Sequence, residues 1–143
     1  MSIADIRESG VARMDEEEIE QHLLEKGTGI LALPAEEAPY AVPMSFGYDG
    51  DSRLYFAYLL FGTQSEKATL SQRAETARFL VYSGESMHDW WSLLLTGTIE
   101  QVPEDGWDEL QEAMRNAWHP DLFAANPMRG LEGYRFEITD RTG

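Results

Sequence analysis

Cysteine is absent from the 143 residues of this chain. Its absence excludes disulfides, thiolate metal ligands and a cysteine nucleophile. The sequence also lacks an apolar run long enough to cross a bilayer, and its first ten residues show no basic start followed by an apolar core. We therefore expect a soluble cytoplasmic protein without a membrane partner.

Positive charge is scarce: the chain has 11 lysine and arginine residues, two of them lysine, against 26 acidic residues. A net charge of −15 argues against nucleic acid as a partner. At molar salt the screening length falls to about 3 Å, so the self-repulsion of such a surface largely disappears. We interpret the composition as an adaptation to a high-salt cytoplasm, such as that of a halophilic archaeon. An acidic mesophilic protein is the alternative.

Helical periodicity occurs in three segments. In the first, Asp15 is a candidate N-cap, Glu18 follows three residues later, and Gly27 is the expected stop. The other two expected helices are Ser65–Arg73 and a segment in which Trp107, Leu110, Met114 and Trp118 share one face.

Six segments have the composition of strands, and Gly50 lies in a hairpin turn between two of them. Strands joined by hairpins, without alternation of strand and helix, indicate a mainly β (α+β) chain: an antiparallel barrel or sandwich with appended helices. We expect one domain, with residues 1–14 as a flexible N-terminal segment. The predicted strands are Gly27–Leu33, Ala41–Tyr48, Leu54–Phe61, Thr76–Ser83, Trp91–Val102 and Tyr134–Thr139.

Few residues suggest catalysis or metal binding. The three histidines, His22, His88 and His119, share no ligand spacing, so we expect no metal site. His88-Asp89 could belong to a nucleophilic triad with a serine, but no Gly-x-Ser-x-Gly motif occurs. Trp90 and Trp91 are adjacent in a predicted strand and must point to opposite faces. We expect one of them at a subunit interface, where it could also stack on a planar ligand.

Lys67 stands in the first turn of a predicted helix, behind the loop Gly62–Ser65. A lysine there is unfavourable for the helix dipole, but an anion bound at the free N–H groups would reverse that effect. Two interpretations remain open: an exposed lysine on an acidic surface, or a phosphate site to which Ser65 donates a hydrogen bond.

The order of these motifs resembles the FMN-binding split barrel of the pyridoxamine 5′-phosphate oxidase-like family, and in particular its nitroimidazole-reductase-like branch. The matching pieces are GTGILAL after the first helix, the hairpin PYAVPMSFGYDGDSRLYF, SEK before a helix, and WSLLLTGTIEQV. The resemblance spans Asp15 to Thr139. It implies a six-stranded antiparallel split β-barrel.

The same resemblance implies an FMN site shared between two subunits of a homodimer. The first hairpin strand would line the flavin ring, the next strand would end near the phosphate, Ser-x-Lys would bind the phosphate, and the strand after the tryptophan pair would approach the flavin across the interface. The implied cofactor-binding residues are Val42, Pro43, Met44, Ser45, Tyr58, Ser65, Lys67, Trp91 and Ser92.

The sequence also departs from the family's oxidases. Tyr40 and Ser45 stand where those enzymes carry an arginine and a lysine, and no segment for pyridoxal phosphate follows Thr139, so pyridoxamine phosphate oxidation is not expected. The first functional hypothesis is an FMN-dependent oxidoreductase that transfers electrons between a reductant, such as a nicotinamide cofactor, and a small molecule. The alternative is a non-catalytic module that binds flavin, haem or deazaflavin.

Overall fold

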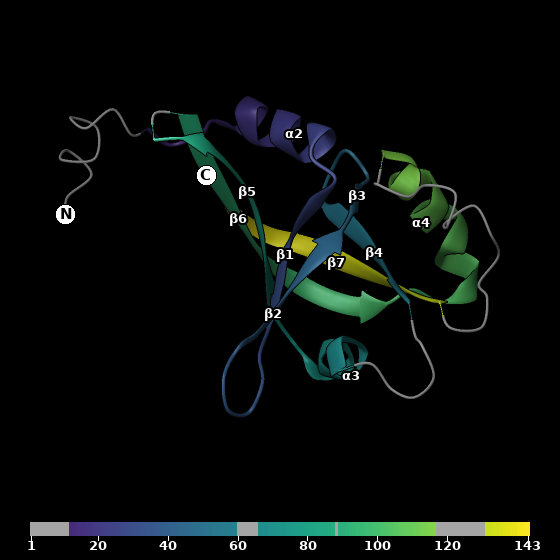
Figure 1. The fold of residues 1–143 in the computed structure, drawn as a ribbon. Coiled ribbons are helices and arrows are strands. Elements are labelled where there is room, and N and C mark those ends of the chain that lie inside the picture. The colour runs from purple at the N-terminus through teal and green to yellow at the C-terminus, as the bar shows by residue number, and fades with distance from the viewer. Residues whose placement is uncertain (1–11, 60–65, 88, 117–130) are drawn as a thin grey trace.

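A computed structural model describes residues 12–59, 66–87, 89–116 and 131–143. These residues form one curled antiparallel sheet with helices around its ends (Figure 1). The strands are β1 (Thr28–Leu33), β2 (Tyr40–Ser45), β3 (Gly47–Tyr48), β4 (Arg53–Leu59), β5 (Ala77–Ser86), β6 (Asp89–Gln101) and β7 (Leu131–Thr142). The helices are α2 (Glu16–Glu25), α3 (Glu66–Arg73) and α4 (Trp107–Ala113), with short 3-10 turns at Glu104–Gly106 and Met114–Asn116.

The strand order is β2-β1-β5-β6-β7-β4-β3, so the two edge strands are neighbours in the chain, separated only by Phe46. The sequence predicts a single strand over Ala41–Tyr48 and hence six strands, and this prediction is wrong. At Phe46 the backbone N–H leaves the ladder and donates to the carbonyl of Gly27 at 2.9 Å. The chain bends there because β2 pairs with β1, whereas β3 pairs with β4.

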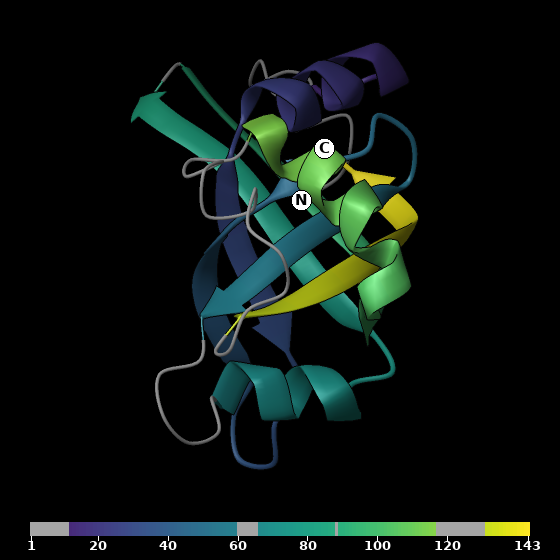
Figure 2. The same ribbon diagram turned by 90° about the vertical axis from the view of Figure 1, so that its right-hand side faces the viewer.

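Two apolar cores hold the sheet. The larger lies inside the curl and includes Leu31, Phe56, Phe79 and Phe136, all fully buried. The smaller lies between the outer side of β4 and α4, where Tyr55, Trp107, Leu110 and Met114 meet. Figure 2 shows α4 lying along this side of the sheet, with α3 at the lower end of the molecule.

Helix α2 begins as predicted, because the Asp15 carboxylate accepts a hydrogen bond from the Glu18 N–H at 2.8 Å. It ends at Glu25, two residues before the predicted glycine. Arg141 of β7 pairs with Glu16 at 2.9 Å and lies 3.4 Å from Glu20, which also accepts the Tyr48 hydroxyl at 2.8 Å. These polar contacts fasten α2 over one open end of the curled sheet.

The third predicted helix is shorter than its apolar pattern. Regular α-helix ends at Ala113, and Met114 begins a 3-10 turn. Trp118, which was expected on the same face, lies outside the described residues. Among the helices that the structure describes, none has the length and apolar character needed to span a membrane.

Candidate functional site

Part of the outer face of the sheet carries no acidic side chain. Burial alternates along β1, β2, β5 and β6, which separates inward from outward residues. Farther along β6, Glu100 also points outward, so the acid-free part of the face is limited. The outward residues of β1, of β2, of β5 from Arg78 to Gly84 and of β6 from Trp90 to Thr96 form what we call the acid-free face, all of it within the described chain. They are Thr28, Ile30, Ala32, Ala41, Pro43, Ser45, Arg78, Leu80, Tyr82, Gly84, Trp90, Ser92, Leu94 and Thr96.

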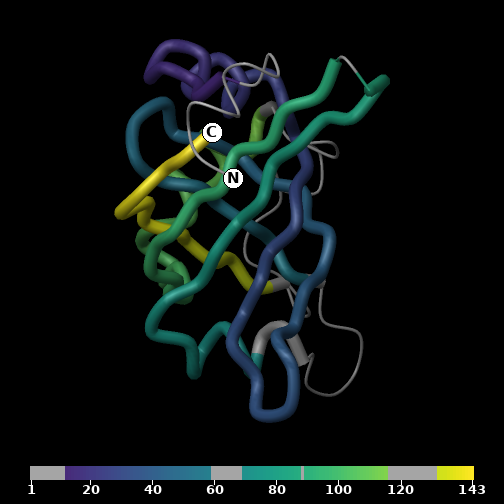
Figure 3. Tube along the Cα trace, turned by 90° about the vertical axis from the view of Figure 1, so that its left-hand side faces the viewer, coloured from purple at the N-terminus to yellow at the C-terminus, as the bar shows by residue number. Residues whose placement is uncertain are grey.

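The middle of this face is apolar. Pro43 pairs with Ile30, Ile30 with Leu80, and Leu80 with Leu94, so these four side chains form one row across the strands. Figure 3 looks onto this side of the sheet, and no described helix crosses in front of it. Arg78 is the one charged residue of the face, and no ion pair to it is found within the described residues. The face therefore offers apolar contact and a free cation to a partner or ligand.

Strand β2 brings a free backbone edge to the acid-free face, because within the described sheet it pairs with β1 on one side only. Pro43 and Ser45 point outward, whereas Val42 and Met44 point inward and pack in or against the core. Of the four residues predicted to contact a flavin ring, Pro43 and Ser45 could do so through their side chains. Val42 and Met44 could do so only through their backbone groups.

Trp91 lies at the α2 end of the sheet and Trp90 on the opposite face, which confirms that the adjacent tryptophans diverge. The ring of Trp91 stacks on His22 of α2, with 3.7 Å between centroids and 21° between planes. The Lys26 ammonium lies 5.7 Å from the centroid of the same ring. Ser92, the next residue, points outward beside Tyr82 of β5. Of this predicted pair, Ser92 alone belongs to the acid-free face.

Tyr58 lies inside the curl at the end covered by α3. Its hydroxyl lies 2.8 Å from the buried Ser71 hydroxyl, and its ring stacks on Tyr134 at 4.2 Å between centroids. Burial raises the pKa of Tyr58 above its ordinary value, and burial raises the pKa of Tyr134 to about 12. These contacts fix α3 against the sheet and so position its first turn.

The resemblance implies two phosphate-binding residues, and the structure describes the backbone position of one of them. Lys67 is in the first turn of this helix, one turn before Ser71, and Ser65 lies outside the described residues. The structure therefore places α3 at one end of the sheet. It brings Pro43, Ser45 and Ser92 onto one face, and it leaves Val42, Met44, Tyr58 and Trp91 on the inner side.

Sequence reasoning did not single out Arg78, Tyr82 or Gly84. A signal was present, because alternation within β5 already assigns these residues to one face. What the sequence could not show is that this face is left open, since that depends on where the helices pack.

A cavity of about 340 Å³ lies next to α4, where β6 ends and β7 begins. Glu104 and Glu132 line it together with Trp107, so its charge is unsuited to a phosphate. No group of three or more potential metal-ligating side chains lies together in the part of the chain that the structure describes.

Comparison with known proteins gives a family and a fold. The sequence model of the pyridoxamine 5′-phosphate oxidase family matches residues 15–143. No curated protein matches the sequence. Similar solved structures include an FAD-binding protein from Mesorhizobium loti, with a TM-score of 0.69 at 19% identity over 92% of this chain and 93% of that one.

Two proteins from Mycobacterium smegmatis are also similar. An FAD-binding protein has a TM-score of 0.67 at 16% identity, over 92% of this chain and 94% of that one. An FAD- and haem-binding protein has a TM-score of 0.65 at 17% identity, over 91% of this chain and 71% of that one. At these identities the likeness shows a shared fold.

Proposed function

Since the chain belongs to the pyridoxamine 5′-phosphate oxidase family, we propose that it is a flavoprotein that binds FMN between two copies of itself and transfers electrons to or from a small molecule. The observation that carries this proposal is the acid-free face. In a chain of net charge −15, it is a surface on which an anionic cofactor and a second acidic subunit meet no carboxylate.

The charge argument works for both partners. FMN brings a phosphate, and a second copy brings another −15, so each is repelled by most of the surface. The apolar row from Pro43 to Leu94 would gain by burial, at roughly 25 cal/mol for each Å² of apolar surface removed from water. A second copy on this face therefore buries apolar area without bringing carboxylates together.

The shape of the sheet is the reason why two copies are needed. The acid-free face is the outer side of a curled sheet, so it is convex, and a flat ring can touch only part of it. Ser45 and Ser92 are three strands apart, which at the usual strand spacing is about 14 Å. We infer that Pro43 and Ser45 of one copy and Ser92 of the other form opposite walls around the ring.

The remaining contacts follow from the family. The free edge of β2 would offer backbone groups to the polar edge of the ring, and Ser65 and Lys67 at the start of α3 would hold the phosphate. Arg78 adds a cation on the same face, and the structural neighbours that bind FAD support a flavin in general. The residues present thus fit a flavin with an anionic tail.

The flavin, when bound, supplies the electron-transfer chemistry. The side chains near the ring are apolar or small hydroxyls, so their role is to bind, orient and exclude water. Solvent can supply the proton. Tyr40, which stands where the family's oxidases carry a basic residue, is half-buried and packs against the core. We therefore do not expect oxidation of pyridoxamine phosphate.

The second candidate function is a non-catalytic module that binds flavin, haem or deazaflavin. One structural neighbour binds both FAD and haem, which is the reason to test it. A histidine could serve as an axial haem ligand. His22 is already stacked on Trp91, and His88 and His119 lie outside the described residues. Haem binding by His22 would require that the stack be broken, which makes flavin the better proposal.

Titration with FMN, FAD, riboflavin, a deazaflavin and haem tests the proposal, read by visible absorption and with the mass in solution measured alongside. We expect a dimer that binds FMN more tightly than riboflavin and is reduced by a nicotinamide cofactor. A protein that binds no flavin would contradict the proposal. Bound flavin that no reductant can reach would favour the non-catalytic module.

A further inference from the structure

Helix α3 has few apolar side chains with which to pack against the sheet. In its sequence, EKATLSQR, Leu70 is the one large apolar residue, and it packs partly buried against the larger core, as does Ala74 just after the helix. Apolar contact has no preferred direction, so one leucine fixes neither the rotation nor the axial position of a helix. The orientation of α3 must therefore come from directional contacts.

Two hydrogen bonds supply these directional contacts. The Ser71 hydroxyl lies 2.8 Å from the Tyr58 hydroxyl of β4, and the Gln72 amide donates to the Tyr134 hydroxyl of β7 at 3.3 Å. The Tyr134 hydroxyl in turn donates to the Glu132 carboxylate at 2.8 Å. Adjacent residues of a helix point about 100° apart, so the bonds of Ser71 and Gln72 together fix the rotation of α3.

The Tyr58–Ser71 pair is out of reach of a ligand in solvent. The exposed fraction is 0% for Tyr58 and 1% for Ser71, and Ser71 is the one buried polar residue other than tyrosine and tryptophan in the part of the chain that the structure describes. The resemblance implies that Tyr58 contacts the cofactor, but a side chain in this position can act on a ligand only through the helix that it holds.

A buried pair of hydroxyls is a costly way to fill space. Each hydroxyl loses its contact with water and regains little more than that loss through the bond between them. Phenylalanine and alanine would fill the same space without polar atoms, but they would not favour one orientation of α3 over another. The pair is therefore better explained by the position that it imposes than by the stability that it adds.

The same pair closes the segment that carries the proposed phosphate residues. Ser65 and Lys67 lie between Tyr58 and Ser71 in the sequence. The Tyr58–Ser71 bond fixes the two ends of that segment and the direction in which the first-turn N–H groups of α3 point. An anion at these groups is sensitive to that direction, since the helix dipole acts along the helix axis.

We propose that Tyr58 and Ser71 are positioning residues that hold α3 in the orientation an anionic group requires at its first turn, with Tyr134 and Gln72 in support. They thereby determine specificity, because a flavin that ends in a phosphate gains from this orientation and a flavin without a phosphate does not. The identity of the ligand rests on the function proposed above, whereas the hold on α3 does not.

The variants that test this role are Tyr58→Phe, Ser71→Ala and the two changes combined. Each single change breaks the bond and leaves the other hydroxyl of the pair buried, so it should lower stability. The double variant removes both hydroxyls and should regain most of that stability. If the pair served stability alone, the double variant would also regain the normal preference for FMN over riboflavin. If the pair positions α3, that preference stays low.

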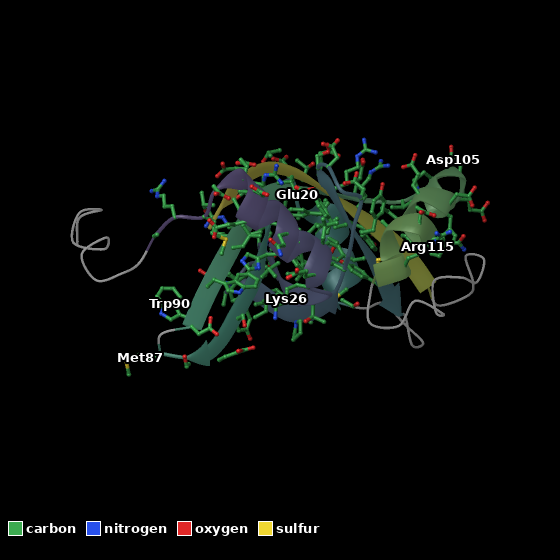
Figure 4. All side chains as sticks on the ribbon, turned by 90° about the horizontal axis from the view of Figure 1, so that it is seen from above. Glu20, Lys26, Met87, Trp90, Asp105 and Arg115 are labelled. Carbon is green, nitrogen blue, oxygen red and sulfur yellow. The ribbon has the colours of Figure 1, made fainter. Side chains whose placement is uncertain are left out.

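The matched control is Tyr48→Phe. Tyr48 is a buried tyrosine of β3 whose hydroxyl donates to Glu20 of α2 at 2.8 Å, so the change removes the same group from another contact between a strand and a helix. Helix α2 lies at the end of the sheet opposite α3 (Figure 1), and Figure 4 shows Glu20 on α2. This variant should therefore leave the preference for FMN unchanged.

Two measurements separate the specificity from the hold on α3. The ratio of the dissociation constant of riboflavin to that of FMN, measured by flavin fluorescence, should fall about fivefold in all three test variants and stay within about twofold in Tyr48→Phe. In the flavin-free protein, amide hydrogen exchange of residues 66–73 should be faster in the double variant, although urea denaturation shows similar global stability.

A normal ratio in the double variant would overturn the proposal, and so would unchanged exchange in α3. If the protein without substitutions shows no preference for FMN over riboflavin, the phosphate site of the proposed function fails. The exchange rates alone then decide whether Tyr58 and Ser71 hold α3.

Discussion

His22 and Trp91 lie face to face, with 3.7 Å between their ring centroids, and join α2 to β6. Replacing His22 by alanine removes the stack and should lower the free energy of unfolding by about 1 kcal/mol. Urea denaturation measures the loss. Leu24→Ala is the control, because Leu24 is an exposed residue of the same helix and its replacement should have little effect. Equal effects of the two changes would show that the stack contributes nothing particular.

The two lysines allow a matched test of the phosphate site. Lys67→Ala should weaken FMN binding about tenfold and leave riboflavin binding unchanged, because riboflavin has no phosphate. Lys26, the other lysine, is the residue after the end of α2 and lies beside Trp91 of β6. Lys26→Ala removes the same charge, and its FMN affinity should stay within about threefold of the unchanged protein, as measured by flavin fluorescence. If both variants lose the same amount of FMN affinity, the effect comes from net charge and the assignment of Lys67 to the phosphate fails.

Gly97, in the Thr-Gly step of β6, should tolerate no side chain. A Cβ there would collide with the carbonyl oxygen of Glu137 on β7, next to an irregularity in the pairing of the two strands. Gly97→Ala should therefore cost roughly 2 to 3 kcal/mol of unfolding free energy, because backbone must move to relieve the collision. Gly84→Ala, also in a strand, meets no atom within 4 Å and should be neutral or stabilising. Chemical denaturation measures the change in unfolding free energy of the two variants. An equal cost would contradict the pairing register of β6 with β7.

Stability should fall above pH 10. Burial raises the pKa of Tyr134 to about 12 and that of Tyr58 above its ordinary value of about 10. Between pH 10 and the raised pKa of each tyrosine, the unfolded chain loses a proton that the folded chain keeps. Rising pH therefore favours unfolding there by about 1.4 kcal/mol per pH unit for each tyrosine. Below pH 10 both states are protonated and the effect vanishes. Tyr58→Phe should reduce the slope of unfolding free energy against pH, and an unchanged slope would contradict this origin.

Salt should stabilise the protein. Described ion pairs such as Arg53 with Glu137 involve partly exposed side chains, so they contribute little and lose little when screened. Repulsion among 26 acidic residues is the larger electrostatic effect, and screening reduces it. The thermal midpoint should rise steadily from low to molar potassium chloride. A sucrose series serves as the control for general stabilisation, and a flat salt dependence would argue against adaptation to high salt.

Local sequence features predicted most of the elements. The Asp15 cap, the Gly50 turn and the alternation in β5 each depend on a few neighbouring residues, and all three are present in the structure. The division at Phe46 was missed because it depends on β1 and β4 lying on different sides of the bend. The end of α4 at Ala113 was missed because the apolar pattern continues past it.

The site was less predictable than the fold, for a physical reason. Alternation shows that Pro43 and Ser92 are outward, but which outward face stays free depends on where α4 packs. Two of the predicted cofactor-binding residues, Ser45 and Tyr58, lie on opposite sides of the sheet. In the proposed dimer, a second chain would bring side chains from distant strands around one ligand, and no single-chain pattern encodes its position.

The place of β7 in the sheet has a consequence for synthesis. This strand is made last of the seven, yet it lies between β6 and β4, so β3 and β4 cannot join the other strands until it is present. While residues 131–142 are still inside the ribosome, the nascent chain holds two separate pieces of sheet with exposed edges. The protein must therefore complete its fold after these residues emerge, at a rate limited by long-range pairing.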